Sequence, residues 1–254
     1  MRLPRRDPAE AGFDPNALAA ATEFAAEHEI PWPRDLRSFL ESGHFEPAPA
    51  NEVLGPLPSR GPTNGLILRH GTVLAEWGDP LQVDVTFSVA KSYLSLLAGI
   101  AFADGLIGDL DAPVRESVRD GGFDSAQNAP ITWRHLLQQT SEWEGELFGK
   151  SDVVDRNRRL ATEGANTMKG QFRPLEAPGT FWEYNDVRVN RLSLSLLRLF
   201  RRPLPEVFAE RIMRPIGASE TWRWHGYRTS VVEVGGRMIE SVSGGSHWGG
   251  GVQI

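Results

Sequence analysis

Ser88 and Lys91 stand three residues apart, at the predicted start of an apolar helix. Side chains at positions i and i+3 of a helix share one face, so this hydroxyl and this amine can hydrogen-bond to each other. A serine that attacks a carbonyl carbon needs a base for its proton and donors for the oxyanion, and the free N–H groups at a helix start favour negative charge. The spacing therefore predicts acyl transfer to Ser88. A serine that caps a helix one turn before a surface lysine has the same pattern.

Lysine is rare in this chain, which makes its presence at position 91 informative. Only Lys91, Lys150 and Lys169 occur, whereas arginine supplies 24 of the 27 basic residues. Arginine keeps its proton in proteins, but a buried lysine can lose it because burial disfavours the charged form. We therefore expect burial to lower the pKa of Lys91 toward the neutral amine that a base must be.

The helix that would carry this pair is predicted over Ser88–Asp104 and closed by Gly105. Two short apolar strands around a turn at Gly71 predict a β-hairpin before it. Other elements follow from apolar periodicity and from glycine or proline at their ends: helices at about 15–28, 133–139, 187–202 and 206–213, and a hairpin over 231–242 that turns at Gly235-Gly236. This mixture predicts an α/β (α+β) fold.

Residues 1–60 form a predicted N-terminal arm that contains one helix. Asp14 is the expected N-cap of that helix, and the rest of the segment is rich in proline. It fits an extended arm or lid and, about equally well, a solvated linker. Residues 61–254 would form the main domain.

Composition excludes several function classes. The chain of 254 residues has no cysteine and a net charge of −6, which excludes thiolate chemistry and argues against nucleic-acid binding. Its longest apolar run, residues 94–103, is too short to cross a membrane. The histidines form no zinc pattern, and Ser246 lacks the Gly-x-Ser-x-Gly context of α/β-hydrolases. We expect no cofactor, no metal and no membrane partner, and a cytoplasmic location, or a periplasmic one if a leader was removed.

Several segments, in order along the chain, resemble motifs of the serine β-lactamase and penicillin-binding family. They are residues 86–92, 104–107, 110–114, 131–141, 177–186 and 215–218. The resemblance is greatest to the branch that holds class C β-lactamases, family VIII carboxylesterases, D,D-peptidases and 6-aminohexanoate-dimer hydrolase. It implies an antiparallel sheet flanked by helices, a mostly helical domain, and a site at their junction.

The resemblance also implies roles for the segment that ends in Tyr184-Asn185-Asp186. Tyr184 would supply a phenolic oxygen that shares proton transfer with Lys91, and either of the two can be the base. Asp186 stands where the family has asparagine, so Asn185 could hydrogen-bond the substrate in its place, or Asp186 could orient Lys91.

Two more departures from the family pattern are Gln139 in place of histidine and Glu142 in place of glycine. Tryptophans could line an apolar acyl pocket, although core packing suits most of them better. They are Trp143, Trp182, Trp222, Trp224 and Trp248.

The last residues of the chain allow two interpretations. His247-Trp248-Gly249 fits the His-x-Gly form of the family's third motif, but residues 243–251 fit better the glycine-rich loop that precedes it. In the second case the third motif and the last strands would lie beyond Ile254, and the sheet would be incomplete. We therefore expect a shortened chain, with Asn185, Asp186, Trp182, His247 and Trp248 as the candidate substrate-binding residues.

Taken together, the residues and the resemblance predict a serine hydrolase that forms an acyl-enzyme on Ser88 and hydrolyses a small ester or amide. The resemblance favours small esters or linear amides of the 6-aminohexanoate type. A β-lactamase or D,D-peptidase is the alternative among enzymes. Gln139 and Asp186 also leave open a non-catalytic binding or sensor domain, or an inactive fragment. The oligomeric state is not predicted.

Overall fold

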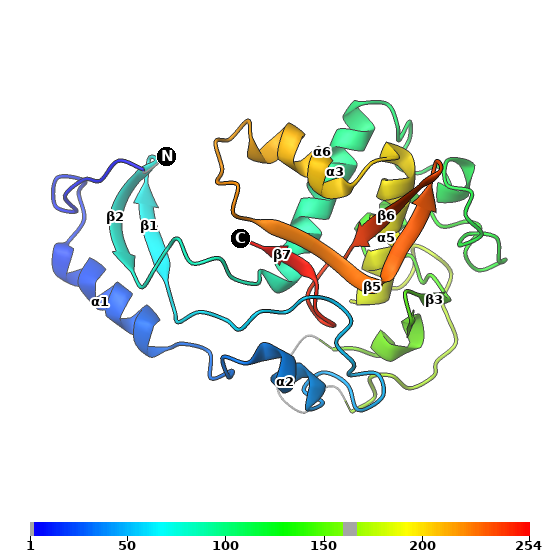
Figure 1. The fold of residues 1–254 in the computed structure, drawn as a ribbon, viewed down its shortest axis with the longest axis horizontal. Coiled ribbons are helices and arrows are strands. Elements are labelled where there is room, and N and C mark those ends of the chain that lie inside the picture. The colour runs from blue at the N-terminus through cyan, green and yellow to red at the C-terminus, as the bar shows by residue number, and fades with distance from the viewer. Residues whose placement is uncertain (1–2, 160–166) are drawn as a thin grey trace.

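The chain combines helices with small antiparallel sheets (Figure 1). A computed structural model describes residues 3–159 and 167–254. The helices are α1 (Pro15–Glu27), α2 (Leu36–Glu41), α3 (Ala90–Ala103), α4 (Trp133–Leu137), α5 (Asp186–Phe200) and α6 (Leu204–Phe208). The short helical turns are η1 (Phe87–Val89), η2 (Val114–Glu116), η3 (Asp152–Asp155) and the wider η4 (Ala209–Met213). The strands are β1 (Gly65–Arg69), β2 (Thr72–Trp77), β3 (Glu146–Leu147), β4 (Lys150–Ser151), β5 (Arg223–Val234), β6 (Arg237–Val242) and β7 (Gly251–Gln253).

Helices α3 and α5 pack against each other at the centre of the core. The buried face of α3 is apolar and includes Leu94, Leu97 and Ala101, which explains why this stretch folds as a helix against a partner. Helix α5 is buried along most of its length, and the side chain of Asn185 caps its first turn by accepting hydrogen bonds from two backbone N–H groups. The two helices therefore bring residues near position 88 and position 186 to one place.

The larger sheet has the strand order β6-β5-β7, and both pairings are antiparallel. The backbone that leads into η1 is fastened to β7, because Asp84 and Ile254 exchange backbone hydrogen bonds at 2.9 Å and Thr86 N–H donates to Val252 O at 2.9 Å. Strand β7 thus fixes the position of the residues just before Ser88.

The N-terminal hairpin and helix α1 form the other side of the molecule (Figure 1). Strands β1 and β2 pair only with each other as a named sheet, and α1 packs against β2. Between this hairpin and the core, residues 42–56, here called the arm segment, lie on the body of the protein. Lys150 Nζ donates to Ala50 O at 2.6 Å and to Glu52 O at 3.1 Å, and Leu54 N–H donates to Trp248 O at 2.8 Å.

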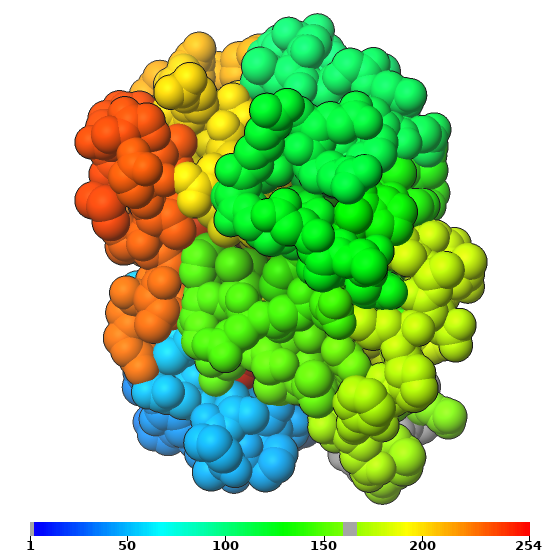
Figure 2. Space-filling model, turned by 90° about the vertical axis from the view of Figure 1, so that its right-hand side faces the viewer, coloured from blue at the N-terminus to red at the C-terminus, as the bar shows by residue number. Residues whose placement is uncertain are grey.

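The arm segment is therefore a docked part of the structure, and the solvated-linker interpretation is wrong for these residues. Figure 2 shows the blue N-terminal part of the chain directly below the green middle part. The predicted first hairpin and the predicted helices near 15–28, 88–104, 133–139 and 187–202 are confirmed within a few residues at their ends. The second hairpin turns at Gly235-Gly236 as predicted, but its first strand, β5, already begins at Arg223, and the helix predicted at 206–213 is divided into α6 and η4. Helix α2 and the short strands β3, β4 and β7 were not predicted. Among the described residues, no helix combines the length and apolar character needed to span a bilayer.

Candidate active site

Ser88 lies in the turn η1, immediately before α3, and its side chain is exposed. Phe87, the residue before it, has a φ of 47°, in the left-handed region that a bulky side chain rarely adopts. Such strain persists only where the surroundings fix the backbone, and it is common at functional sites. Here the backbone bonds to β7 on one side and α3 on the other hold this conformation, which presents the Ser88 hydroxyl at the protein surface.

Lys91 places its amine beside that hydroxyl. Lys91 Nζ donates to Ser88 Oγ at 3.0 Å, to Asp186 Oδ1 at 2.5 Å and to Gly244 O at 3.2 Å. All three protons of an ammonium thus have an acceptor. The i, i+3 contact expected from the sequence is present, and the lysine side chain is only 13% exposed.

The predicted low pKa of Lys91 is wrong. Burial by itself lowers the pKa of Lys91, but the Asp186 carboxylate and the Tyr184 oxygen act in the opposite direction and outweigh burial, so the net pKa lies above its ordinary value. The sequence argument considered desolvation alone, because nothing in the sequence showed that Asp186 would meet this amine. In this structure Lys91 is an ammonium.

Asp186 is the centre of the charges around Lys91. Its Oδ1 faces Lys91, while its Oδ2 lies 2.7 Å from Arg158 and 3.2 Å from His247 Nδ1. Burial alone would raise the pKa of Asp186, but these three partners outweigh burial, and its pKa lies well below its ordinary range. Two roles were expected for Asp186, substrate binding and the orientation of Lys91, and the geometry supports the second.

Tyr184 has two cations close to its ring. Lys91 Nζ and the guanidinium carbon of Arg158 each lie 4.7 Å from the centre of its ring. The backbone around it is held by Gln139, whose carbonyl accepts from Glu183 N–H at 3.1 Å and whose side-chain oxygen accepts from Asn185 N–H at 3.4 Å. Gln139 therefore holds the backbone on both sides of Tyr184 in place, at the position where the family has histidine.

Gly245 completes the immediate surroundings of the nucleophile. A Cβ at this position would lie 3.0 Å from Lys91 Nζ, 3.4 Å from Asp186 Oδ1 and 3.7 Å from Ser88 Oγ. The backbone of the loop between β6 and β7 thus approaches the reacting groups as closely as a residue without a side chain allows. His247 belongs to this loop and not to a strand, so its interpretation as a residue of the third-motif strand is wrong.

The other candidate substrate-binding residues separate into buried and exposed ones. Asn185 is fully buried, and its amide donates to Asp152 O at 2.8 Å while its oxygen caps α5, so it does not face the site. Trp248 is fully buried against Tyr227 and packs in the core. Trp182 is 52% exposed, and its contact with a substrate stays a prediction.

Four functional candidates escaped the sequence analysis: Glu46, Asp155, Arg158 and Lys169. With Lys91, Asp186 and His247 they form a group of buried charges that we call the nucleophile cluster. Lys169 Nζ contacts Glu46 and lies 3.1 Å from Asp155 Oδ1. Asp155 accepts from Asp186 N–H at 2.8 Å, which ties η3 to α5. No motif pointed to these residues, because the segments that hold them are far apart in the chain.

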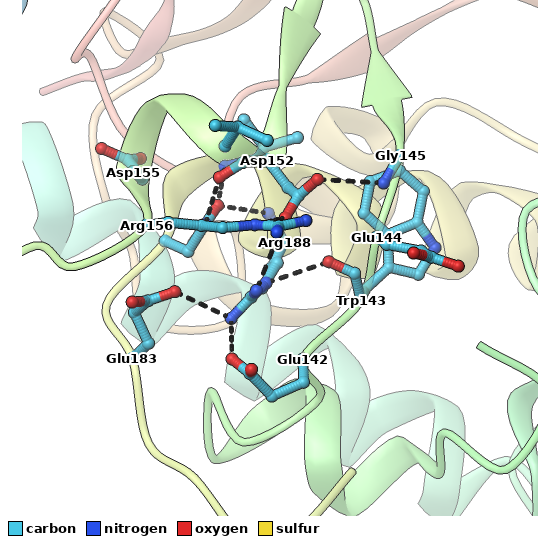
Figure 3. Close-up of polar contacts among 12 residues, drawn as sticks. Glu142, Trp143, Glu144, Gly145, Asp152, Asp155, Arg156, Glu183 and Arg188 are labelled. Atoms are coloured by element: carbon cyan, nitrogen blue, oxygen red, sulfur yellow. Dashed lines mark hydrogen bonds and ion pairs between the residues drawn. The ribbon is translucent and has the colours of Figure 1, made fainter. Parts of the chain in front are cut away.

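We call a second group of buried charges the arginine cluster, and Figure 3 shows part of it. Arg188 lies 2.6 Å from Glu142 and 3.2 Å from Glu183, and Arg173 binds both oxygens of Glu142 at 2.6 and 2.7 Å. Asp152 and Arg156 complete the arginine cluster. Although burial raises the pKa of Glu142, the two arginines outweigh it and the net pKa is lowered. Glu142 has a φ of 47°, a backbone conformation that suits glycine. Its ion pairs with Arg173 and Arg188 hold it in this conformation.

Glu46, Asp155 and His247 bring potential ligand atoms within 4.8 Å of one another, a spacing that could hold a metal ion. However, the ammonium of Lys169 already contacts both carboxylates. Among the described residues, the positive charge of Lys169 thus balances the negative charge of this group, and we assign no metal ion to it.

Comparison with known proteins places these residues in context. The family model described as Beta-lactamase matches residues 69–226. A search of curated proteins gives no match. Among solved structures, a Bacillus anthracis protein assigned as a 6-aminohexanoate-dimer hydrolase superposes with a TM-score of 0.53 and 13% identity, covering 100% of this chain and 59% of that one. This similarity confirms the predicted fold class. The chain spans about three fifths of that structure's length.

Two further structures align over less of the chain. A Mycobacterium bovis β-lactamase has 24% identity and a TM-score of 0.40, covering 62% of this chain and 44% of its own. A β-lactamase/D-alanine carboxypeptidase from Yersinia pestis has 18% identity and a TM-score of 0.46, with 72% and 56% covered.

Proposed function

The chain belongs to the beta-lactamase family, and on that premise we propose that it is a serine hydrolase that forms an acyl-enzyme on Ser88. The observation that carries this proposal is the exposed Ser88 hydroxyl, which accepts a hydrogen bond at 3.0 Å from Lys91 at the edge of a buried cluster of charges. A nucleophile with an adjacent proton-exchanging group, itself oriented by a third group, is the arrangement that acyl transfer requires.

Tyr184 is the proton acceptor in this proposal, and Lys91 is its cationic partner. Because Asp186 holds Lys91 as an ammonium, that amine cannot take the serine proton. The phenol oxygen of Tyr184, whose ring lies 4.7 Å from both cations, is the group left to do so. As Ser88 Oγ bonds to the substrate carbonyl carbon, its proton passes to Tyr184 and then to the leaving group, while the bond between the carbonyl carbon and the leaving group breaks. Water then attacks the carbonyl carbon of the acyl-enzyme; one water proton passes through Tyr184 to Ser88 Oγ as the bond between Oγ and the acyl carbon breaks, and the acid is released.

The proposed substrates are small esters or linear amides of the 6-aminohexanoate type. The site has an exposed hydroxyl for attack, and Trp182 offers an apolar surface two residues before Tyr184. The name assigned to the Bacillus anthracis structure points to linear amides as well. The cytoplasmic location also stays a proposal.

Hydrolysis of p-nitrophenyl esters of short acids tests this function. We expect release of p-nitrophenol at a steady rate, lost in the Ser88→Ala variant. Ser92→Ala is the matched control, because Ser92 is an exposed serine about one turn further along the chain, whereas the Lys91 amine donates to the Ser88 hydroxyl. Equal rates for Ser88→Ala and the unchanged chain would refute Ser88 as the nucleophile.

One observation favours a second candidate, a sensor that is acylated but does not turn over. The ion pair between Lys91 and Asp186 at 2.5 Å, where the family has a neutral asparagine, restrains the ammonium. A burst of p-nitrophenol with no steady phase would support the sensor, while steady release supports the hydrolase. Nitrocefin, a coloured β-lactam, given to the same samples tests the β-lactamase alternative: its turnover in place of ester turnover would overturn the proposed substrates.

A further inference from the structure

The arm segment is held to the core by lysines. Lys150 donates to the carbonyls of residues 50 and 52, and Lys169 donates to Phe45 O at 3.3 Å and contacts Glu46. Both lysine side chains are nearly excluded from water, as is Glu46 at 4% exposure. These contacts fix the arm segment at the site, so that Glu46 enters the nucleophile cluster from outside the main domain.

His247 joins Glu46 to Asp186. Its Nε2 contacts Glu46 Oε1, and its Nδ1 lies 3.2 Å from Asp186 Oδ2. The ring of Phe45 stacks on the imidazole at 4.5 Å between centres. The imidazole therefore lies between two carboxylates, one from the arm segment and one from the residue that binds Lys91.

We propose that Glu46 and His247 are positioning residues: together they hold Asp186 in the orientation that places its other oxygen against Lys91. The inference rests on the proposed role of Ser88 and adds that the arm segment is part of the active site. Only an imidazolium can donate to both carboxylates, because a neutral imidazole has a single N–H. The clamp on Asp186 is thus complete only when His247 is protonated.

The charges around His247 favour its protonated form. Burial lowers the pKa of His247, but its hydrogen bonds to Asp186 and Glu46 and the charge of Asp155 outweigh burial, so the net pKa is raised above its ordinary value. Titratable and charged groups from each element packed on His247 face it, either directly or through one partner residue. They are His44 and Glu46 of the arm segment, Asp155 of η3, Asp186 of α5, Lys91 of α3, Arg158 and Lys169.

An NMR titration of the imidazole protons tests the clamp on the full chain, with the His247→Gln spectrum assigning the signal. We expect His247 of the unchanged protein to titrate above the ordinary histidine value of about 6.5. In Glu46→Gln, which keeps the shape but removes the charge, the pKa of His247 should fall. Glu52→Gln is the matched control, because Glu52 lies in the same arm segment but pairs with Arg228 at the surface, and it should leave His247 unchanged.

The rate at which a fluorophosphonate labels Ser88 gives the second readout. At a pH below both titrations of His247 the imidazole is protonated in both proteins, so we expect the Glu46→Gln variant to be labelled almost as fast as the unchanged chain. At a pH between the two titrations only the variant has lost its imidazolium, and we expect its labelling rate to be several-fold lower than that of the unchanged chain. A purely structural role for Glu46 would change the rate equally at both pH values.

The outcomes separate this inference from the proposed function. Absence of labelling in the unchanged chain would overturn the function of Ser88, while the NMR titration would still decide whether Glu46 and His247 are coupled. Titration of His247 at or below its ordinary value, or the same His247 pKa in Glu46→Gln and Glu52→Gln, would overturn the inference. The titration of the unchanged chain needs no variant, so it decides even if Glu46→Gln fails to fold.

Discussion

The nucleophile cluster and the arginine cluster share two stretches of chain but contain different chemistry. Turn η3 gives Asp155 to the first and Asp152 to the second, and the stretch at the start of α5 gives Asp186 to the first and Glu183 to the second. The arginine cluster joins carboxylates to guanidinium groups that never lose their proton. The nucleophile cluster adds two lysines and a histidine, with Tyr184 beside them, and these groups can exchange a proton.

This difference indicates a division of labour. Fixed charges that are fully paired hold a backbone segment in place, and removing one partner leaves the other buried without compensation. Exchangeable groups next to an exposed hydroxyl can move protons at little structural cost. We therefore expect changes in the nucleophile cluster to alter rates, and changes in the arginine cluster to alter stability.

After Ser88→Ala, the largest effect on rate is expected from Tyr184→Phe. Removing the phenol oxygen takes away the proposed proton acceptor, and loss of such a group typically lowers a rate by about 10²- to 10⁴-fold. Steady-state ester hydrolysis measures it. Tyr93→Phe is the control, because the Tyr93 ring lies on α3 and packs against Phe208 and Trp224 in the core. Equal losses in the two variants would contradict the role of Tyr184.

The largest effect on stability is expected from Glu142→Gln. This change removes one of the two carboxylates that the buried Arg188 and its neighbour Arg173 share, and breaking a buried ion pair costs about 3–5 kcal/mol. Urea unfolding followed by circular dichroism measures the loss. The control is Glu146→Gln, since Glu146 is exposed in the nearby strand β3. The division of labour fails if Glu142→Gln unfolds like the unchanged chain but is slow in hydrolysis.

A smaller effect on rate is expected from Gly245→Ala. The new methyl group would force Lys91 to move by a few tenths of an ångström, and small misplacements of reacting groups lower rates. We expect a several-fold lower rate of ester hydrolysis in a protein that remains folded. Gly99→Ala is the matched control, because nothing lies within 4 Å of its added Cβ in helix α3. That change should leave the rate unaltered and raise the free energy of unfolding by about 0.4–1 kcal/mol. Equal rates in both variants would show that Gly245 is not close to the reacting groups.

The fold and the local part of the site could be predicted from sequence because both depend on short-range patterns. The spacing of Ser88 and Lys91 fixes their contact within one helical turn, and apolar periodicity located α3 and α5. Short pieces such as β3 and β7 have too few residues for a pattern. Their strand character comes from the partners that they meet.

The charge state of Lys91 could not be predicted for a different reason. It depends on Asp186, 95 positions later in the chain, and this carboxylate in turn depends on Arg158 and on His247. Glu46 gave no signal at all, because its proline-rich surroundings resemble a linker. Only the folded chain shows that two lysines anchor those surroundings to the core.

The most direct test of this account is the location of the adduct after the chain reacts with a fluorophosphonate. We predict a single adduct by intact mass, placed on Ser88 by peptide mapping, and no adduct in Ser88→Ala. An adduct on any other residue, or labelling that persists in Ser88→Ala, would contradict the assignment of Ser88 as the nucleophile of this protein.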